Sequence, residues 1–595
     1  MTDRTTRRRV AALASCFVWV MLSIGAPAEA SSPLPGSSPS STPGTWDVIV
    51  YGATPGGIAA AIAAAREHAR VALLEPSSHI GGMMTSGLGS SDIGSTDRVS
   101  GLALHFFRRL GVAYGLGAQA ISWDMTPALA ERTFSAMLRD GKVSVFTGQR
   151  LREQGGVKVQ GQRIQSISME SGRTFSAGVF IDATYEGDLM ARAGVSYVVG
   201  REAVSQYGES LAGVRPPQPE MPLMGSTSTS GALAPGVDGA PLGPVGSADA
   251  RIQPYTFRLC VTTVAGNQVP FPRPAGYDPA RYLLVQGHLV ALQNAGRPPV
   301  LANVVTINPL PDGKADLNAA GPLSTDPLGA SDAYPNASYA QRRTIWQEHY
   351  AYEAGLLYFL ANDPSVPASV GVELRLWGLC RDEFVDTQHW PRLLYVREAR
   401  RMVSAFVLTQ ADLITQRHKP DAIGVATYRI DAHATRLIAD AHGTLEFEGL
   451  LSARIGGPYD IPYRILVPRR SEIVNLLDPV TVSASHVAIA SLRMEQQYMV
   501  MGEAAGTAAA LALESRVTVQ DVDVAALQAR LQAHAVVVRI RSTPGQATSN
   551  AAAATVAVPA ANSIGASYGL AISLIGIMLA ILVVVGAAAV HWRRR

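Results

Sequence analysis

The sequence predicts an α/β protein built on a doubly wound, Rossmann-like sheet, with a second domain inserted into it. An apolar, β-branched run at Trp46–Tyr51 is typical of a buried strand, and a glycine-rich turn follows it directly. An alanine-rich helix is then expected at Ile58–His68, and a second strand, Arg70–Leu74, ends on Glu75. The chain has 595 residues, too many for one hydrophobic core, so we expect two domains plus terminal segments.

The elements after this unit separate into two kinds. Period-two patterning predicts short strands, with an antiparallel meander running into a buried strand, at Val143–Phe146, Val157–Val159, Ile164–Glu170 and Thr174–Ile181. Helical patterning predicts helices at Leu102–Leu110, Pro127–Arg139, Arg342–Ala361, Arg397–Gln416 and Gly502–Leu513. The α/β alternation is lost from about Val195 to Phe447, which indicates a separate, substrate-covering domain.

The glycine-rich turn carries the clearest chemical signal. Gly52 would make a tight turn, and Gly57 would let the helix approach the strand closely. Thr54 replaces the middle glycine of the usual G-x-G-x-x-G pattern, while Pro55 suits a first helical turn. Backbone N–H groups at such a helix start bind a pyrophosphate, and Glu75 could accept ribose hydroxyls. The competing interpretation is a glycine-rich turn without a ligand.

Both ends of the chain predict export. Arg4 and Arg7–Arg9 precede an apolar run and the small-x-small sequence Ala28-Glu29-Ala30, as in a cleaved signal peptide; an uncleaved anchor is the alternative. Tyr568–Val590 is uncharged, apolar and long enough to span a bilayer, whereas a buried core helix is the alternative. Arg593–Arg595 follow at once and predict a cytoplasmic C-terminus, so the globular part would lie outside the cell.

Cysteine content and charge add two further expectations. Cys16 leaves with the signal peptide, so Cys260 and Cys380 either form one disulfide or remain two separate thiols. The formal net charge is +3 and no basic stripe with interleaved aromatics is present, which predicts no nucleic-acid partner.

Several longer segments of the chain form a recognisable series, in a fixed order over roughly Trp46 to Leu513. They are DVIVYGATPGGIAAAIAAAR, LLEPSSHIGGMMTSGLG, FIDATYEGDLMARAG, LPDGKADLN, GLLYFLA, LYVREARRM, YRIDAH and VSASHVAIASLRMEQQYMVMGEAAGTAAALA. In these segments the chain resembles the FAD-dependent oxidoreductases of the two-dinucleotide-binding-domain type, in particular a secreted bacterial branch. The resemblance implies FAD as cofactor and redox chemistry on an organic substrate.

The resemblance also assigns cofactor contacts. FAD phosphates would lie at Gly52, Thr54, Gly56 and Gly57, ribose at Glu75, the flavin ring near Gly81 and Gly82, and a further strand-end contact at Asp182. The last FAD segment would comprise Gly502, Glu503, Ala505 and Gly506. There a small-residue helix N-terminus would face the pyrimidine end of the flavin.

Three residues are candidates for catalysis. Hydride transfer to flavin usually needs a base for the accompanying proton. His433 follows Asp431 by two positions, so on a strand the carboxylate would lie on the same face and orient the imidazole. His486 precedes the expected flavin helix, and Arg493 could bind a substrate carboxylate or hydroxyl. Structural hydrogen bonding is the competing role for each, and no His/Cys cluster predicts a metal.

The expected organisation follows from these assignments. It comprises a signal peptide (1–30), a linker (31–45), the first segment of a discontinuous FAD-binding domain (46–195), a substrate or cap domain (196–447), the second segment of the FAD-binding domain (448–540), a low-complexity linker (541–567), a transmembrane helix (568–590) and a basic cytoplasmic tail (591–595).

The expected function is an exported, membrane-tethered FAD-dependent oxidoreductase that oxidises a small organic molecule by hydride transfer to flavin. O2 or a membrane quinone would be the electron acceptor, because NAD(P)H is scarce outside the cell. The alternatives are an NAD(P)-linked oxidoreductase that uses the Gly52 loop for the nicotinamide cofactor, and a surface carbohydrate-binding or lyase-like protein with structural FAD.

Overall fold

The computed structural model describes residues 45–219, 233–321, 323–440 and 442–540. The described residues up to Val538 belong to one compact unit. The expected signal peptide (1–30) and transmembrane helix (568–590) lie outside the described residues. Within the described ranges, no helix combines the length and the apolar character that crossing a membrane requires.

The first sheet is built around strand β1, and its seven strands follow the order β3-β2-β1-β6-β5-β4, with β21 beside β6. Its parallel part consists of β3 (Ser144–Phe146), β2 (Val71–Leu74), β1 (Thr45–Tyr51), β6 (Thr174–Asp182) and β21 (Leu476–Leu477). The strand expected near Val143 therefore joins this parallel part. The antiparallel meander is β4 (Val157–Gln160), β5 (Arg163–Ser168) and the start of β6.

The two faces of this sheet are covered differently. Val48 and Val50 of β1 pack with the apolar residues of two long helices, whereas Ile49 and Tyr51 pack with the meander and a short helix. The helices are α1 (Pro55–Arg66), α11 (Glu495–Ser515) and the five-residue α4 (Asp188–Arg192). The expected α/β class is confirmed. The doubly wound detail is not, because the meander takes the place of a second layer of long helices.

Helices α1 and α11 approach each other at backbone distance. A Cβ atom at Gly502 would overlap the carbonyl oxygen of Gly56, and one at Gly506 would overlap that of Ala60. These glycines lie in the middle of α11, which begins at Glu495. The expectation that Gly502–Gly506 forms a helix N-terminus is therefore wrong, since the helix continues through two further turns on its N-terminal side. Glu503 has a structural role in the same helix, because its carboxylate accepts hydrogen bonds from the Arg66 guanidinium and from Leu102 N.

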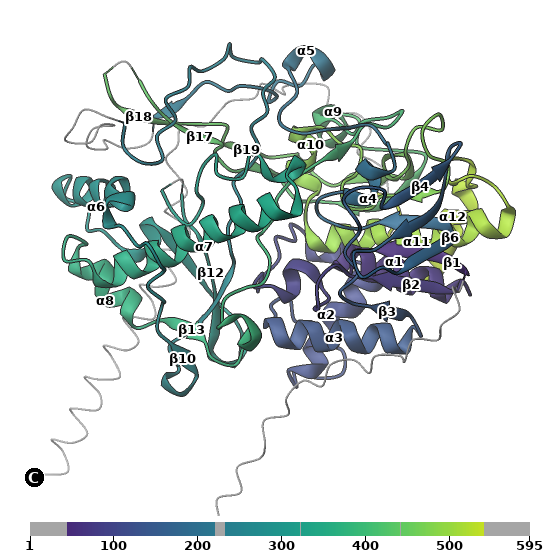
Figure 1. Ribbon diagram of the computed structural model, residues 1–595, viewed down its shortest axis with the longest axis horizontal. Helices are drawn as coiled ribbons and strands as arrows, with labels where there is room; N and C mark the ends of the chain where they lie inside the picture. Colours follow the sequence, from purple (N-terminus) through teal and green to yellow (C-terminus); the bar gives the residue numbers. More distant parts are fainter. Residues whose placement is uncertain (1–44, 220–232, 322, 441, 541–595) are drawn as a thin grey trace, which may run out of the picture. The chain divides into compact units, whose positions relative to one another are not determined.

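The second sheet is antiparallel and has the strand order β10-β13-β9-β12-β11. Its strands are β9 (Leu259–Thr262), β10 (Gln268–Val269), β11 (Val305–Pro309), β12 (Lys314–Ala319) and β13 (Gly378–Cys380). Figure 1 shows it beside three helices, away from β1 and β2. These helices are α6 (Leu283–Asn294), α7 (Tyr339–Asn362) and α8 (Ala368–Arg375). The helix expected at Arg342–Ala361 is thus confirmed as α7.

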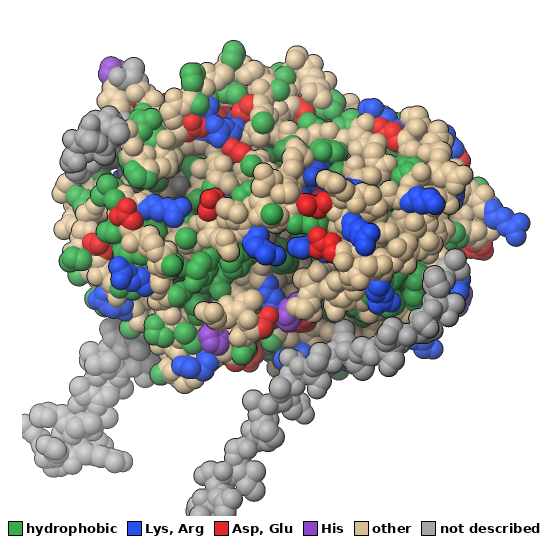
Figure 2. Space-filling view, viewed as in Figure 1, with side chains coloured by type: hydrophobic (Ala, Val, Ile, Leu, Met, Phe, Trp, Pro, Cys, Tyr) green, Lys and Arg blue, Asp and Glu red, His purple; other side chains and the backbone are tan. Residues whose placement is uncertain are grey.

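The remaining elements are short. The strands are β7 (Tyr197–Val198), β8 (Gln218–Pro219), β14 (Arg401–Met402), β15 (Ala422–Ala426), β16 (Ile430–Ala432), β17 (Arg436–Ala439), β18 (Leu445–Glu448), β19 (Leu451–Ala453) and β20 (Tyr459–Pro462). The helices are α2 (Gly101–Ala113), α3 (Pro127–Asp140), α5 (Val204–Tyr207), α9 (Gln410–Ile414), α10 (His486–Leu492) and α12 (Val524–Ala533). On the face in Figure 2, basic and acidic side chains are interspersed.

The helix expected at Arg397–Gln416 is wrong. Residues 401–402 form β14, which pairs with β7, and only Gln410–Ile414 is helical. The Arg401 guanidinium is buried and reaches Glu202 Oε1 at 2.8 Å and the carbonyl oxygen of Gly200 at 2.6 Å. Contacts with distant segments thus determine the backbone conformation here, and they override a locally helical sequence pattern.

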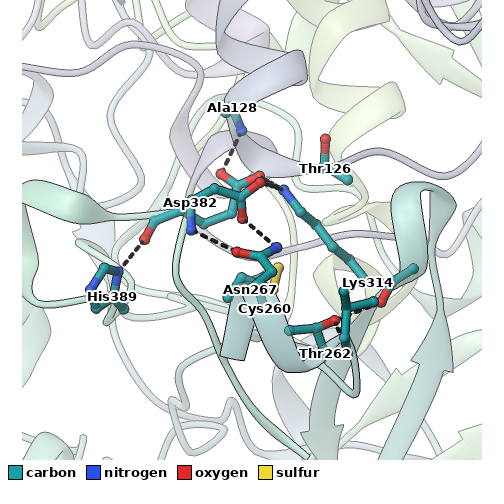
Figure 3. Close-up of a disulfide and its surroundings, with 12 residues drawn as sticks. Thr126, Ala128, Cys260, Thr262, Asn267, Lys314, Asp382 and His389 are labelled. Carbon is teal, nitrogen blue, oxygen red and sulfur yellow. Dashed lines mark hydrogen bonds and ion pairs between the residues drawn. A yellow bond between two sulfur atoms is a disulfide. The ribbon is translucent and has the colours of Figure 1, made fainter. Parts of the chain in front are cut away.

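Cys260 and Cys380 form a disulfide, which decides between the two alternatives left open by the sequence. It joins neighbouring strands β9 and β13, with a Cα–Cα distance of 5.5 Å. Figure 3 shows the polar cluster beside it, which includes Lys314 and Asp382. Lys314 Nζ lies 2.6 Å from Glu383 Oε1. Glu383 Oε2 also accepts from Ala128 N at 2.9 Å. The disulfide-linked strands are therefore tied to the start of α3.

Substitution of Gly502 by Ala tests the helix contact. Gly502→Ala should lower the free energy of unfolding by about 1–3 kcal/mol, because the new methyl group forces α11 away from α1. Gly266→Ala is the matched control: nothing lies within 4 Å of its Cβ position. Denaturant unfolding of the two variants would refute the close contact if both were equally stable.

Removal of the disulfide should destabilise the protein. The two cysteines are 120 positions apart, so the double variant Cys260→Ser/Cys380→Ser loses on the order of 4 kcal/mol of stability through loop entropy. Thermal unfolding with and without a reductant measures this. Reductant should lower the midpoint of the wild type and leave the double variant unchanged; an equal response of both proteins would contradict the assignment.

Candidate functional site

The turn between β1 and α1 has the backbone geometry of a ligand cradle. Gly52 has a φ of +100°, and a Cβ atom there would lie 2.8 Å from Thr184 N. A Cβ atom at Gly57 would overlap the carbonyl oxygen of Gly52. Side chains are excluded at both positions, so the turn, the helix and the end of β6 meet through their backbones.

Thr54 has a defined role in place of the usual glycine. Its Oγ1 accepts from Gly57 N at 3.2 Å, which caps α1, and donates to the carbonyl oxygen of Ala183 at 2.7 Å. Pro55 is the first residue of α1 and has no N–H. Gly56 N has no acceptor among the described residues, so a free donor and the positive end of the helix dipole remain for an anion.

Glu75 lies beside this turn. Its carboxylate accepts from Ala53 N and from Ser77 N, each at 2.8 Å. Burial raises its pKa. A carboxylate offers about four acceptor positions, so it can still accept from ligand hydroxyls.

A second glycine turn closes over the first. Gly81 N donates to the carbonyl oxygen of Ala53 at 2.7 Å, and Gly81 and Gly82 both have positive φ. Met83 and Met84 follow and are fully buried. The structure thus brings together the Gly52–Gly57 turn, Glu75 and the Gly81–Gly82 turn. Gly502, Glu503, Ala505 and Gly506 lie in α11, where Gly502 contacts Gly56 and Gly506 contacts Ala60.

Asp182 ends β6 and is fully buried, where its carboxylate accepts from Thr184 N, Thr184 Oγ1 and Met190 N. A second strand-end acid, Asp478, was not predicted from the sequence; it follows β21, which pairs with β6 in parallel register. Burial raises the pKa of both carboxyl groups, and the charge of Asp182 raises that of Asp478 further. The apolar pair Leu476-Leu477 before an acid was the available signal for this second strand end.

His433 is the candidate base with the most suitable geometry. Its Nδ1 lies 2.6 Å from Asp326 Oδ2, so Asp326 and not Asp431 orients the imidazole. The prediction for Asp431 is wrong because its carboxylate lies by Arg429, at 3.1 Å. His433 Nε2 has no hydrogen-bond partner among the described residues, and the side chain is 30% exposed. The nitrogen that would accept a proton is therefore open.

The charges around His433 favour its neutral form. Burial, and then the Arg397 guanidinium, lower the pKa of His433. Burial raises the pKa of Asp326, but Arg397, at 3.1 Å, and His433 outweigh this and lower it overall. An ionised Asp326 facing Nδ1 selects the tautomer with its proton on Nδ1 and its lone pair on Nε2.

Arg493 lies in the same cluster. Its NH2 group donates to the carbonyl oxygen of Asp431 at 2.9 Å, and its NH1 group to Tyr395 Oη at 3.3 Å. Arg397 lies over the Tyr395 ring at 5.2 Å, and Arg493 lies 6.0 Å from it. Arg397 and Tyr395 lie within the LYVREARRM segment. Asp326 carried no local signal, because only the tertiary fold brings it to His433.

His486 lies in a different environment. It is 1% exposed, its Nδ1 faces Glu398 Oε2 at 3.0 Å and its backbone N donates to Glu202. Burial raises the pKa of Glu398, but His486 and Arg401 outweigh it and lower the pKa to about 2. The structural interpretation therefore fits His486 better than the catalytic one. Across the described ranges, no group of three or more His, Cys, Asp or Glu side chains could hold a metal ion.

Solved structures resemble parts of the chain. OxyS anhydrotetracycline hydroxylase from Streptomyces rimosus is 12% identical over 29% of this chain and 40% of its own, with a TM-score of 0.21. L-amino acid deaminase from Proteus vulgaris is 16% identical over 29% and 64%, with a TM-score of 0.22. CabE, an aromatic hydroxylase from angucycline biosynthesis, is 13% identical over 51% and 49%, with a TM-score of 0.25. This chain spans less than two thirds of the length of each.

No curated protein matches the sequence. The sequence pattern of the family described as FAD dependent oxidoreductase, however, matches residues 47–531. The matched range contains the Gly52–Gly57 turn, both strand-end acids and the His433 cluster. Membership in that family makes FAD the cofactor and makes the protein an oxidoreductase enzyme, and the chain belongs to this FAD-dependent oxidoreductase family.

Proposed function

We propose that this enzyme oxidises a small organic substrate by hydride transfer to FAD, with His433 Nε2 taking the accompanying proton. The observation that carries the proposal is the Asp326–His433 pair, in which Nδ1 is held at 2.6 Å and Nε2 is left open. An imidazole fixed in this tautomer accepts a proton from a hydroxyl or amine as the donor carbon loses its hydride.

The residues present fit the cofactor. The free N–H of Gly56, the positive end of α1 and the Cβ-excluding turn suit a pyrophosphate, and Glu75 retains acceptor positions for ribose hydroxyls. When bound, FAD supplies the acceptor for the hydride. The buried Met83 and Met84 keep water away from the Gly81–Gly82 turn.

Arg493 and Tyr395 are proposed to position the substrate. Both are buried, and Arg493 Nε has no hydrogen-bond partner within the described part of the chain. A guanidinium with an unused donor attracts a carboxylate or a hydroxyl oxygen. A substrate polar group bound there would lie beside the same Asp431 segment that leads into His433.

We further propose that the enzyme is exported and held at the membrane by residues 568–590. The apolar, uncharged character of that segment and the arginines that follow support this, as does the signal-like start of the chain. The Cys260–Cys380 disulfide is also typical of an oxidising compartment. At the outer face, O2 or a membrane quinone is the accessible electron acceptor.

Removing the base tests the mechanism. His433→Gln should slow flavin bleaching by substrate on the order of a hundredfold or more while the protein still binds FAD. The substrate is first identified by an anaerobic bleaching screen of sugars, hydroxy acids and sterols. His442→Gln, at an exposed position, should react like the wild type. Equal rates for both variants would exclude His433 as the base.

The pH profile should follow the same group. The pKa of His433 is lowered, so its neutral form persists below pH 6.5 and kcat/KM falls only at more acidic pH. Asp326 raises this pKa through its charge and its hydrogen bond. Asp326→Asn should therefore move the acidic limb to lower pH and reduce the rate at the plateau. A limb that stays in place would contradict the pairing.

The proposed location of the enzyme outside the cell and its proposed electron acceptor are tested in one set of experiments. In spheroplasts, an impermeant protease should digest the globular part, and purified reduced enzyme should reoxidise with O2 or a quinone. Retention in the soluble cytoplasmic fraction would contradict the export proposal. NADH is the control reductant: rapid bleaching by NADH, with none by organic substrates, would favour the NAD(P)-linked alternative.

A further inference from the structure

Tyr185 and Glu495 form a buried pair that the proposed mechanism does not use. Tyr185 Oη donates to Glu495 Oε1 at 2.8 Å and accepts from Met83 N at 3.0 Å. Tyr185 is 8% exposed and Glu495 is 2% exposed. Glu495 is the first residue of α11, so this pair connects the start of that helix to the second glycine turn.

The pair lies where the proposed cofactor segments converge. A Cβ atom at Gly82 would overlap Tyr185 Oη, and one at Gly56 would lie 3.0 Å from the carbonyl oxygen of Tyr498. The rings of Tyr185 and Tyr498 are 6.4 Å apart. The first turn of α11 therefore borders both glycine turns, whereas Gly502 lies two turns further along.

One atom of the Glu495 carboxyl group is left without a hydrogen-bond partner. Tyr185 uses its single proton on Oε1, and Glu495 Oε2 is enclosed with no partner among the described residues. A buried polar atom left unpaired costs free energy, so a ligand that pairs with it gains affinity. A carboxylate would require a donor at Oε2, whereas a carboxylic acid requires an acceptor.

The surroundings favour the carboxylic acid. The groups that face Glu495 are the phenols of Tyr185 and Tyr498. The nearby Arg493 guanidinium is bound to the carbonyl oxygen of Asp431 and to Tyr395 Oη. Burial is the largest effect and raises the pKa of Glu495 to about 8, although the Tyr185 hydrogen bond lowers it. The positive end of α11 favours the anion, but this effect is small beside full burial.

We propose that Glu495 is a cofactor-binding residue: its protonated carboxyl group donates a hydrogen bond from Oε2 to an acceptor atom of the bound FAD. This inference rests on the proposed placement of FAD at the two glycine turns. Tyr185 is a positioning residue, because it fixes Oε1 and so directs the proton to Oε2. Above about pH 8 the carboxyl group ionises, loses this donor and places a negative charge beside the cofactor.

The dissociation constant of FAD, measured on the full chain in detergent between pH 6 and pH 9.5, tests the proposal without any substrate. The wild type should bind FAD roughly tenfold more weakly at the alkaline end, which corresponds to loss of one hydrogen bond. Glu495→Gln keeps a donor but cannot ionise, so its affinity should be near that of the wild type at pH 7 and should stay constant with pH.

Two further variants separate this role from a purely structural one. Tyr185→Phe removes the hydrogen bond that lowers the pKa of Glu495, so the weakening should begin at higher pH. Glu353→Gln is the matched control: Glu353 is another fully buried glutamate, in α7, and burial raises its pKa well above the usual value. This control should keep the wild-type dependence on pH.

The outcomes are distinct. A pH dependence that persists in Glu495→Gln, or a loss of FAD binding by a folded Glu495→Gln at pH 7, would overturn the proposal. If Glu495→Gln does not fold, an unchanged onset in Tyr185→Phe would overturn it. None of these results bears on His433, whose role is read from substrate bleaching and from an acidic limb. The two proposals can therefore fail independently.

Discussion

The close approach of α1 and α11 is the contact on which the proposed cofactor cradle depends. Two helices separated in sequence by the whole inserted region meet through backbone atoms at Gly56 and Gly502, and again at Ala60 and Gly506. The contact holds the start of α11 beside the glycine turns, where Glu495 meets Tyr185. It also holds α1 against the sheet, so that the Gly52 turn reaches the end of β6.

Buried ion pairs hold distant segments of the inserted region together. Arg401 reaches Glu202 and Glu398, and Arg397 reaches Asp326. Burying such charges is costly unless each is paired and hydrogen-bonded, so removing one partner would expose the other to a large penalty. Arg397 holds the carboxylate of Asp326, which in turn faces His433 Nδ1. The ion pair between Arg397 and Asp326 therefore stabilises the fold and also positions the proposed base.

The parts of the site that the sequence predicted are local ones. The turn, its flanking strands and Glu75 lie within some thirty positions, where strand, glycine and helix signals reinforce one another. Asp326 lies 107 positions from His433, and no spacing rule connects them. The start of α11 was misplaced because small residues at 502–506 resemble a helix N-terminus, whereas they lie mid-helix and let α11 approach α1. The helix predicted at Arg397–Gln416 is absent for a related reason, because Arg397 and Arg401 bind residues that are distant in the sequence.

Strand β21, which follows the inserted region in the sequence, completes the first sheet. The sheet therefore cannot be completed before the inserted region has been synthesised. Until β21 is made, the second half of β6 presents an open edge at Phe180 and Ile181. An unpaired edge is a template for association with other chains. This part of β6 therefore lacks its β21 partner until the inserted region has been synthesised. With FAD at the proposed position, cofactor binding would follow the docking of α11 on α1, because the start of α11 borders both glycine turns.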